Sequence, residues 1–182
     1  FQTVFLQGKG FQSIFVNGDR FFGDFYSAGL LHLVIPLNKG KNRFLVRVVR
    51  GAFKLKLIRA AGTCSISPRD MLFPDLRQDT LIDSYGAVVV LNHTNRVLKK
   101  VKLEFGDDEV FEKTEIELNP LLPYALAKPA FPMKQLRQPM RNELNSAGQY
   151  SLVITLLHQD ESDNNSVTAI SSTLPLRTTG QH

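Results

Sequence analysis

Apolar and polar residues alternate in short runs along most of the chain. Residues 53–57 read Phe-Lys-Leu-Lys-Leu, and the same period of two recurs over 101–105. In 152–157 both alternating sets are largely apolar, which predicts a strand in the middle of a sheet. A period of two is typical of strands that place one face on a core and the other in water. The pattern therefore predicts an all-β protein.

Glycine, asparagine and aspartate separate these runs at short intervals. These residues accept positive φ or bond their own backbone, so they can reverse the chain. Many short strands with closely spaced turns indicate a sandwich or a barrel. The best helix candidate, 133–144, is limited to a turn or two by Pro132 and Pro139. The turn signals lie at 8–10, 17–19, 38–40, 50–51 and 106–108.

The stretch 61–84 differs from the rest, since it contains Pro68 and Pro74 and little alternation. It is too apolar for a free linker, so we expect it to pack against its neighbours. Because the chain already begins with a strand pattern, we expect it to be a piece of a longer protein that lacks the opening strands of its first domain. The predicted units are the end of one β-sandwich at 1–60, an ordered inter-domain crossing at 61–84, a second β-sandwich at 85–177 and a tail at 178–182.

Charge divides along the same boundary. Residues 1–60 carry ten Lys and Arg against two Asp, whereas residues 61–182 carry twelve against fifteen Asp and Glu, which together account for the net charge of +5. Two structural units with different surfaces are therefore expected. No apolar run approaches the roughly 20 residues of a membrane-spanning helix. The single cysteine, Cys64, excludes an internal disulfide.

Several segments together resemble a known arrangement. The runs "VNGDRFFGDFY", "LVIPL" and "KGKNRFLVRV" resemble the later half of a galactose-binding-like jelly roll. With "SPRDMLFPDL" and "YGAVVVLNHT", they resemble the region upstream of the catalytic domain in bacterial α/β-hydrolases of the prolyl-oligopeptidase type. The resemblance covers about residues 10–105. It implies a jelly-roll-like sandwich followed by an immunoglobulin-like sandwich, with the hydrolase domain beyond them.

The chain contains no Gly-x-Ser-x-Gly elbow, so the nucleophile of such hydrolases is absent from it. We therefore expect a non-catalytic accessory module of a larger exported bacterial hydrolase of the peptidase or esterase type, located in the periplasm or outside the cell. Its main partner would be the catalytic domain of the same polypeptide, which it would position or gate. The alternative is a carbohydrate-binding module of a glycosidase or surface protein. A surface adhesion or scaffold protein is a third hypothesis.

A ligand site is predicted in the loop after the Asn17-Gly18 turn. Aromatic rings can stack on a sugar, and carboxylates can bond its hydroxyl groups. The other interpretation is that these rings pack against a neighbouring domain. The predicted ligand-binding residues are Asp19, Asp24, Phe25 and Tyr26.

A basic face is predicted on a hairpin that turns at 50–51. Pairing of its two strands would align Arg47, Lys54 and Lys56 on one sheet face, as a contact for an anionic partner or as a solvated surface. Nucleic acid is not expected as the partner, because the aromatic residues of these strands lie on the opposite, apolar face. Without its opening strands the first sandwich would expose a sheet edge, which predicts either a homodimer through that edge or docking onto the second sandwich.

Other candidate groups favour structural roles. The acidic tip 107–109 has oxygen ligands suited to calcium, but a solvated turn is the favoured interpretation. The acidic loop 160–165 has the same two interpretations. Glu115 and Glu117 are expected on a solvated strand face, and His32 and Cys64 in structural positions. The sequence thus predicts no catalytic residue, no cofactor and no bound metal.

Overall fold

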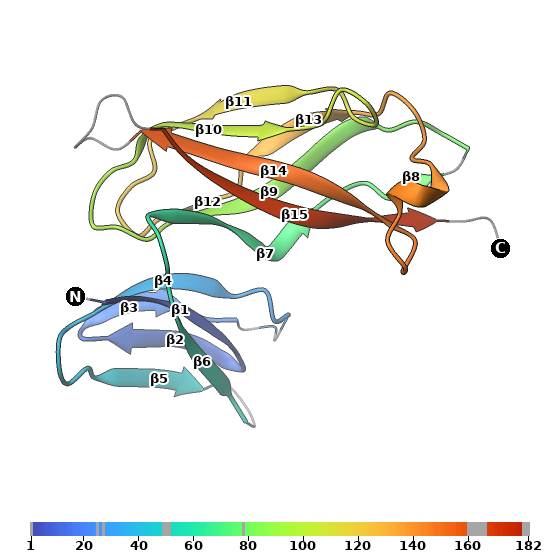
Figure 1. The fold of residues 1–182 in the computed structure, drawn as a ribbon. Helices are drawn as coiled ribbons and strands as arrows, with labels where there is room; N and C mark the ends of the chain where they lie inside the picture. Colours follow the sequence, from blue (N-terminus) through green and yellow to red (C-terminus); the bar gives the residue numbers. More distant parts are fainter. Residues whose placement is uncertain are drawn as a thin grey trace.

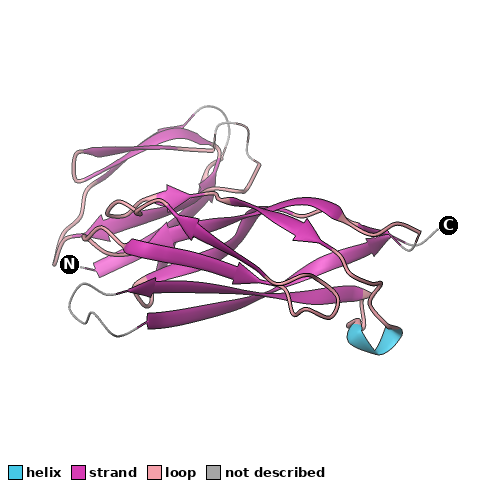
Figure 2. Cartoon of the chain, turned by 90° about the horizontal axis from the view of Figure 1, so that it is seen from above, coloured by secondary structure: helices cyan, strands magenta, loops and turns pink. Residues whose placement is uncertain are grey.

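The structure is a computed structural model that describes residues 2–24, 26, 28–48, 52–77 and 79–159, together with the backbone of 167–179. Strands dominate the described chain, and the one helical segment among these residues is the 3-10 turn η1 (Arg141–Glu143) (Figure 2). The all-β prediction is therefore confirmed. The first two residues of the helix candidate 133–144 instead end β13 (Ala130–Lys134), an edge strand whose pairing with β9 accommodates Pro132.

Residues 2–59 form a small sandwich of two facing antiparallel sheets, with strand orders β4-β1-β6 and β3-β2-β5. Its core contains six buried residues, all contributed by β1, β2 and β4. The chain passes from the first sheet to the second at Gly10, whose φ of +82° suits glycine. The strands are β1 (Gln2–Lys9), β2 (Phe11–Val16), β3 (Asp19–Phe22), β4 (His32–Leu37), β5 (Phe44–Val48) and β6 (Lys54–Arg59).

The second sandwich packs a sheet of order β11-β10-β14-β15-β8 against a sheet in which β9 pairs with β7, β12 and β13. Alternate residues of β10 and β14 point into the shared core, as their period of two predicts. The strand 149–159 lies between β10 and β15, so its central position is also confirmed. The strands are β7 (Cys64–Leu72), β8 (Leu76–Arg77), β9 (Asp83–Asn92), β10 (Lys99–Phe105), β11 (Thr114–Leu118), β12 (Leu126–Ala127), β13 (Ala130–Lys134), β14 (Gln149–Gln159) and β15 (Val167–Thr179).

The segment 61–84, expected as an inter-domain crossing, contributes two strands, β7 and β8, to the second sandwich. Residues 64–67 of β7 pair with 89–92 of β9, and the pairing resumes at Leu72 after an irregularity. Pro68 and Asp70 lie in this irregularity, and Asp70 has a φ of +56°. The broken register hides the period of two, which is why the sequence pattern suggested irregular structure.

The two sandwiches are docked through their adjacent sheets (Figure 1). Val34 of β4 packs with Val89 and Leu91 of β9, and Phe5 of β1 joins this cluster. Residues 88 and 90 of β9 point instead into the core of the second sandwich. β9 is therefore buried on both faces, which explains its continuous apolar run.

Candidate functional site

The predicted ligand loop does not form a convergent site. Asp24 is used by its own loop, because its carboxylate accepts hydrogen bonds from the backbone N–H groups of Ala28 at 2.9 Å and Gly29 at 2.5 Å. Asp19 is exposed at the start of β3, and the side chain of Tyr26 is 89% exposed. Phe25 lies outside the described residues. Of the three that are described, Asp19, Asp24 and Tyr26, none lines the pocket described below.

The predicted basic hairpin does not exist. β5 pairs with β2 and β6 pairs with β1, so Arg47 lies in one sheet of the small sandwich while Lys54 and Lys56 lie in the other. All three side chains are exposed. A basic hairpin requires β5 and β6 to pair with each other, but in this sandwich the two strands belong to different sheets. The single basic stripe is therefore wrong, and Arg47 has other neighbours.

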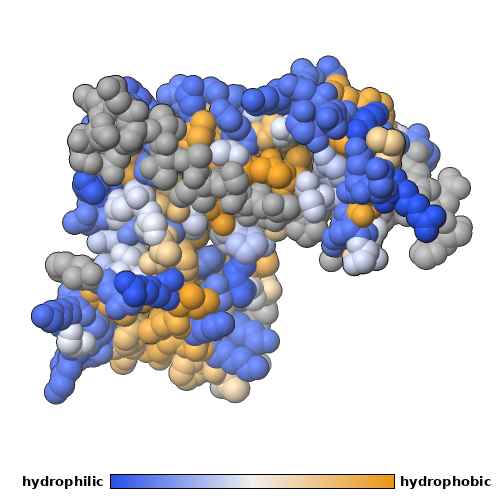
Figure 3. All heavy atoms as spheres, in the orientation of Figure 1, coloured by the Kyte–Doolittle hydropathy of each residue, from blue (hydrophilic) through white to orange (hydrophobic). Residues whose placement is uncertain are grey.

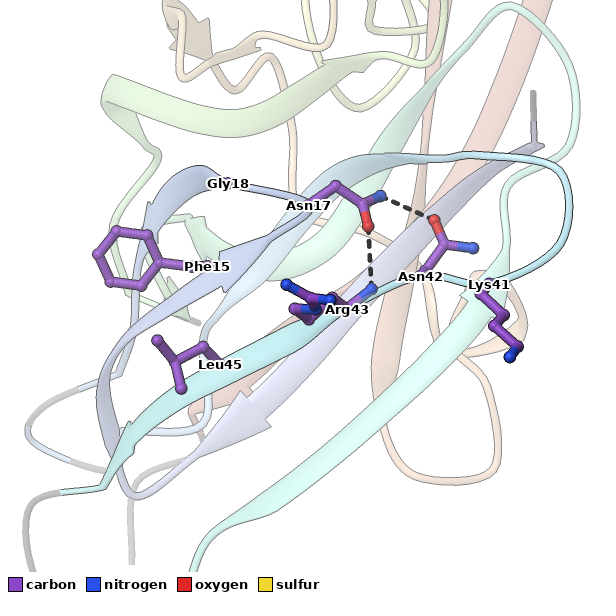
Figure 4. A pocket seen from close by; sticks show the side chains of 7 residues that line it. All are labelled: Phe15, Asn17, Gly18, Lys41, Asn42, Arg43 and Leu45. Carbon is purple, nitrogen blue, oxygen red and sulfur yellow. Dashed lines mark hydrogen bonds between the residues drawn. The ribbon is translucent and has the colours of Figure 1, made fainter.

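A pocket of about 790 Å³ opens at the end of the β3-β2-β5 sheet. Phe15 of β2 and Leu45 of β5 are direct cross-strand neighbours and form its apolar part. Lys41 and Arg43 contribute the positive charge of its wall (Figure 4). Asn17 and Gly18 from the β2–β3 turn and Asn42 from the loop before β5 complete the lining.

Two asparagine side chains hold the pocket's loops together. Asn17 and Gly18 both have positive φ, of 54° and 104°, as a tight β2–β3 hairpin turn requires. The Asn17 side chain accepts a hydrogen bond from the backbone N–H of Arg43 at 2.9 Å and donates to Oδ1 of Asn42 at 2.8 Å. Asn42 in turn donates to the carbonyl of Asn38 at 3.0 Å. These hydrogen bonds tie the β2–β3 turn to the loop before β5 and so set the shape of the pocket.

The pocket continues onto the sheet surface that faces away from the core of the small sandwich. Arg20 lies directly opposite Phe15, and its guanidinium carbon is 5.2 Å from the ring centroid of Phe22. Phe22 is 73% exposed and Leu45 is 67% exposed. We call this surface the outer basic face and define it by the following residues: Phe15, Arg20, Phe22, Arg43, Leu45 and Arg47.

The cations of the outer basic face have no acidic partners within the described chain. No ion pair between described residues involves Arg20, Arg43 or Arg47. Hydrophobic residues gather over the small sandwich, with hydrophilic residues at its border (Figure 3). An exposed apolar surface flanked by uncompensated positive charge is suited to an anionic, partly apolar partner.

A second cluster of functional groups lies buried between the sandwiches. Nδ1 of His32 is 2.6 Å from Oγ of Ser67, and Nε2 of His93 is 2.8 Å from Oγ of Ser65. The ring of Phe5 contacts both imidazoles, at centroid distances of 4.4 and 4.8 Å. Burial, and then the positive charge of Arg69, lowers the pKa of His32 to about 4. Burial also lowers the pKa of His93.

These serine–histidine pairs have the geometry of structural contacts. Ser67 is 1% exposed, so a substrate cannot reach its hydroxyl group. Nδ1 of His93 lies 3.0 Å from a backbone carbonyl where a catalytic triad would place an acid. Arg69 extends from β7 and donates to the side chain of Gln7 at 3.0 Å and to the carbonyl of Gly29 at 2.5 Å. The cluster therefore holds the sandwiches together.

The acidic tip at 107–109 is a capped turn. One carboxylate oxygen of Asp107 accepts hydrogen bonds from the backbone N–H groups of Glu109, Val110 and Phe111, and the other accepts one from the hydroxyl group of Tyr150. Partial burial raises the pKa of Asp107, but these hydrogen bonds outweigh it and lower the pKa below its usual value.

The remaining candidates also have structural surroundings. Glu115 and Glu117 are exposed on β11, and Glu115 lies 2.6 Å from Nζ of Lys102. Cys64 is 2% exposed, and burial raises the pKa of its thiol to about 12. Within the described ranges, no cluster of three or more histidine, cysteine or acidic residues is arranged for a metal. The acidic loop 160–165 lies outside the described residues.

The sequence pattern missed most of the outer basic face. Because successive side chains of a strand point to opposite faces, the sequence does indicate that Phe15 points away from the side of Ile14 and Val16. What it did not reveal was the β2–β5 register, which brings Leu45 and Arg47 beside Phe15 and its neighbours. The loop network of Asn17 and Asn42 depends on the same pairing.

No protein-family model matches the chain, and a search of curated proteins found no significant match. The resemblance to galactose-binding-like and immunoglobulin-like domains therefore remains a prediction. The described part of the chain contains no helix long and apolar enough to cross a membrane.

Proposed function

We propose that the chain is a non-catalytic accessory module of a larger exported bacterial hydrolase of the peptidase or esterase type, and that the outer basic face contacts the catalytic domain of the same polypeptide. The observation that carries the proposal is the exposure of Phe22, Leu45 and three arginines on one sheet face. Contiguous apolar surface of this kind marks contact sites. The type of parent reaction rests on the sequence resemblance alone.

The docking of the two sandwiches supports a positioning role. The apolar cluster around Phe5 and the hydrogen bond from Thr3 Oγ1 to the carbonyl of His93, at 2.9 Å, join them at a buried contact. A module with a firm internal contact can transmit a fixed orientation from one end to the other. A partner held at the outer basic face would therefore keep a defined position relative to the second sandwich.

The test begins with the reading frame on both sides of the chain. A downstream Gly-x-Ser-x-Gly followed by Asp and His supports the proposal, and its absence from the frame overturns it. The full-length enzyme is then compared with its Leu45→Glu variant in steady-state assays on small and large substrates. We expect a several-fold change in kcat/KM that depends on substrate size. Val153→Glu, an exposed apolar position on β14 with 51% exposure, is the matched control and should leave the kinetics unchanged.

Carbohydrate binding is the second candidate function. The pocket favours it specifically, since the Phe15 ring and the side chains of Lys41 and Arg43 border one open volume. Aromatic and polar groups in that combination bind sugars. Titration with neutral and uronic-acid oligosaccharides should shift the amide NMR signals of the pocket residues if this function is correct. Unchanged spectra at millimolar sugar would exclude it.

A further inference from the structure

The β3-β2-β5 sheet ends in an unpaired strand edge. β5 is its terminal strand and pairs with β2 on one side. The backbone N–H of Asn17 donates to the carbonyl of Arg43. Because successive residues of an antiparallel strand point their N–H and C=O groups alternately to its two sides, Leu45, two residues on, also directs its backbone groups towards β2. Phe44 and Val46 then direct theirs to the open side. Among the described residues, no hydrogen bond outside the β2–β5 ladder involves Phe44 or Val46.

The side chains beside this edge form a simple pattern. Arg43, Leu45 and Arg47 lie on the outer basic face and are exposed, whereas Phe44 and Val46 pack against the core. An added strand would therefore meet a basic, an apolar and a basic side chain in succession, two residues apart. Exposed strand edges bind extended peptides through the backbone, while alternate side chains give specificity.

Charge decides which strand fits. If β5 of a second copy paired antiparallel about Leu45, Arg43 of each chain would lie opposite Arg47 of the other. Like charges at directly opposed positions destabilise a strand pair. Carboxylates at the same two positions would instead pair with both arginines, which have no acidic partner among the described residues. The edge thus disfavours self-pairing and favours an acidic strand.

We propose that the open edge of β5 binds an extended acidic segment by strand addition, with acidic side chains two residues before and after a central apolar one. The apolar residue packs beside Leu45, on the face that also carries Phe15, and the two carboxylates lie beside Arg43 and Arg47. This inference deepens the proposed function, because it gives the chemistry of the partner at the same face. It does not require that the partner be a hydrolase domain.

The test uses two fluorescein-labelled peptides with the full 182-residue chain. One has the core Asp-Thr-Leu-Thr-Asp, and the other has lysine in place of both aspartates. Fluorescence anisotropy should show saturable binding of the acidic peptide, weakened several-fold by raising the salt from 50 to about 300 mM. Arg43→Glu combined with Arg47→Glu should weaken binding at least tenfold and reverse the preference towards the lysine peptide.

The matched control makes the same change in net charge on β6, a terminal strand of the facing sheet. Lys54→Glu combined with Lys56→Glu alters β6, which belongs to the facing sheet, and should leave affinity within twofold. Circular dichroism melts establish that each variant is folded. Equal losses in both double variants would reduce the effect to non-specific attraction and overturn the proposal.

Amide hydrogen exchange separates strand addition from other contacts. On binding the acidic peptide, the amides of Phe44 and Val46 should become protected at least tenfold. Binding without this protection would overturn strand addition, as would binding of acidic oligosaccharides in place of the peptide. Concentration-dependent self-association that the double arginine variant abolishes would instead identify a second copy as the occupant. If peptide binding holds while no hydrolase domain is encoded, the proposed function fails and this inference stands.

Discussion

The buried histidine between the two sandwiches should make the stability of the protein depend on pH. His32 is 8% exposed and is surrounded by Phe5, Ser67 and the positively charged Arg69, with His93 nearby. Its pKa is about 4 in the folded protein, against an ordinary value of 6.5. Because the unfolded chain binds the proton more readily, stability is fully present above pH 6.5 and is lost as the pH falls towards 4.

The size of the effect follows from the two pKa values. A shift of one pKa unit corresponds to about 1.4 kcal/mol, so the complete loss below pH 4 is roughly 3 kcal/mol. Between pH 7 and pH 5, protonation of the unfolded chain alone removes about 2 kcal/mol. For a domain-sized protein with a free energy of unfolding of roughly 5–15 kcal/mol, this loss is large enough to measure.

Urea denaturation followed by circular dichroism at pH 7 and pH 5 measures the loss, and His32→Asn serves as the non-titrating reference. The asparagine can still bond to Ser67 but cannot gain a proton. We expect the wild type to lose about 2 kcal/mol more than the variant between these pH values. An NMR titration of the His32 ring gives its pKa directly. Equal losses in the two proteins, or a ring pKa near 6.5, would refute the reasoning.

Two further predictions concern groups that hold the backbone in place. Asn92 is fully buried, and its side chain donates to the carbonyls of residues 96, 121 and 122 and accepts a hydrogen bond from the backbone N–H of Thr94. Asn92→Ala leaves these buried groups without partners, so it should lower the free energy of unfolding by about 2–4 kcal/mol in urea denaturation. A loss below 1 kcal/mol would contradict a structural role for this network. A Cβ atom on Gly23 would lie 2.1 Å from the carbonyl oxygen of Phe11, whereas one on Gly40 would meet no atom within 4 Å and would bear only the strain of a φ of +87°. Gly23→Ala should therefore lower the melting temperature more than Gly40→Ala. Equal melting temperatures for the two variants would show that the backbone yields freely at Gly23.

The predictions that held share a local cause. Alternation over 101–105 predicted a strand whose alternate residues are buried, the apolar run 152–157 predicted a central strand, and the Asn17-Gly18 pair predicted a tight turn. Side-chain direction in a strand and the φ values that a residue accepts are set within a few residues of chain. The two sandwiches also pack on one another, which is one of the two outcomes expected of a sandwich that exposes a sheet edge.

The predictions that failed concern pairing between distant segments. The basic stripe required β5 to pair with β6, and the strand in 61–84 was hidden by its interrupted register with β9. The ligand loop was predicted from its residue types, but the carboxylate of Asp24 accepts hydrogen bonds from backbone N–H groups of the same loop.

The sequence by itself determined that the chain is all-β, where most of its strands and turns lie, and that its first third is strongly basic. Only the tertiary structure decided that Phe15, Leu45 and the arginines share one face, and that His32 and His93 are buried beside Phe5. The physical reason is that a period of two assigns each side chain to a face of its own strand. Which strands become neighbours, and in which register, depends on contacts between residues far apart in the chain.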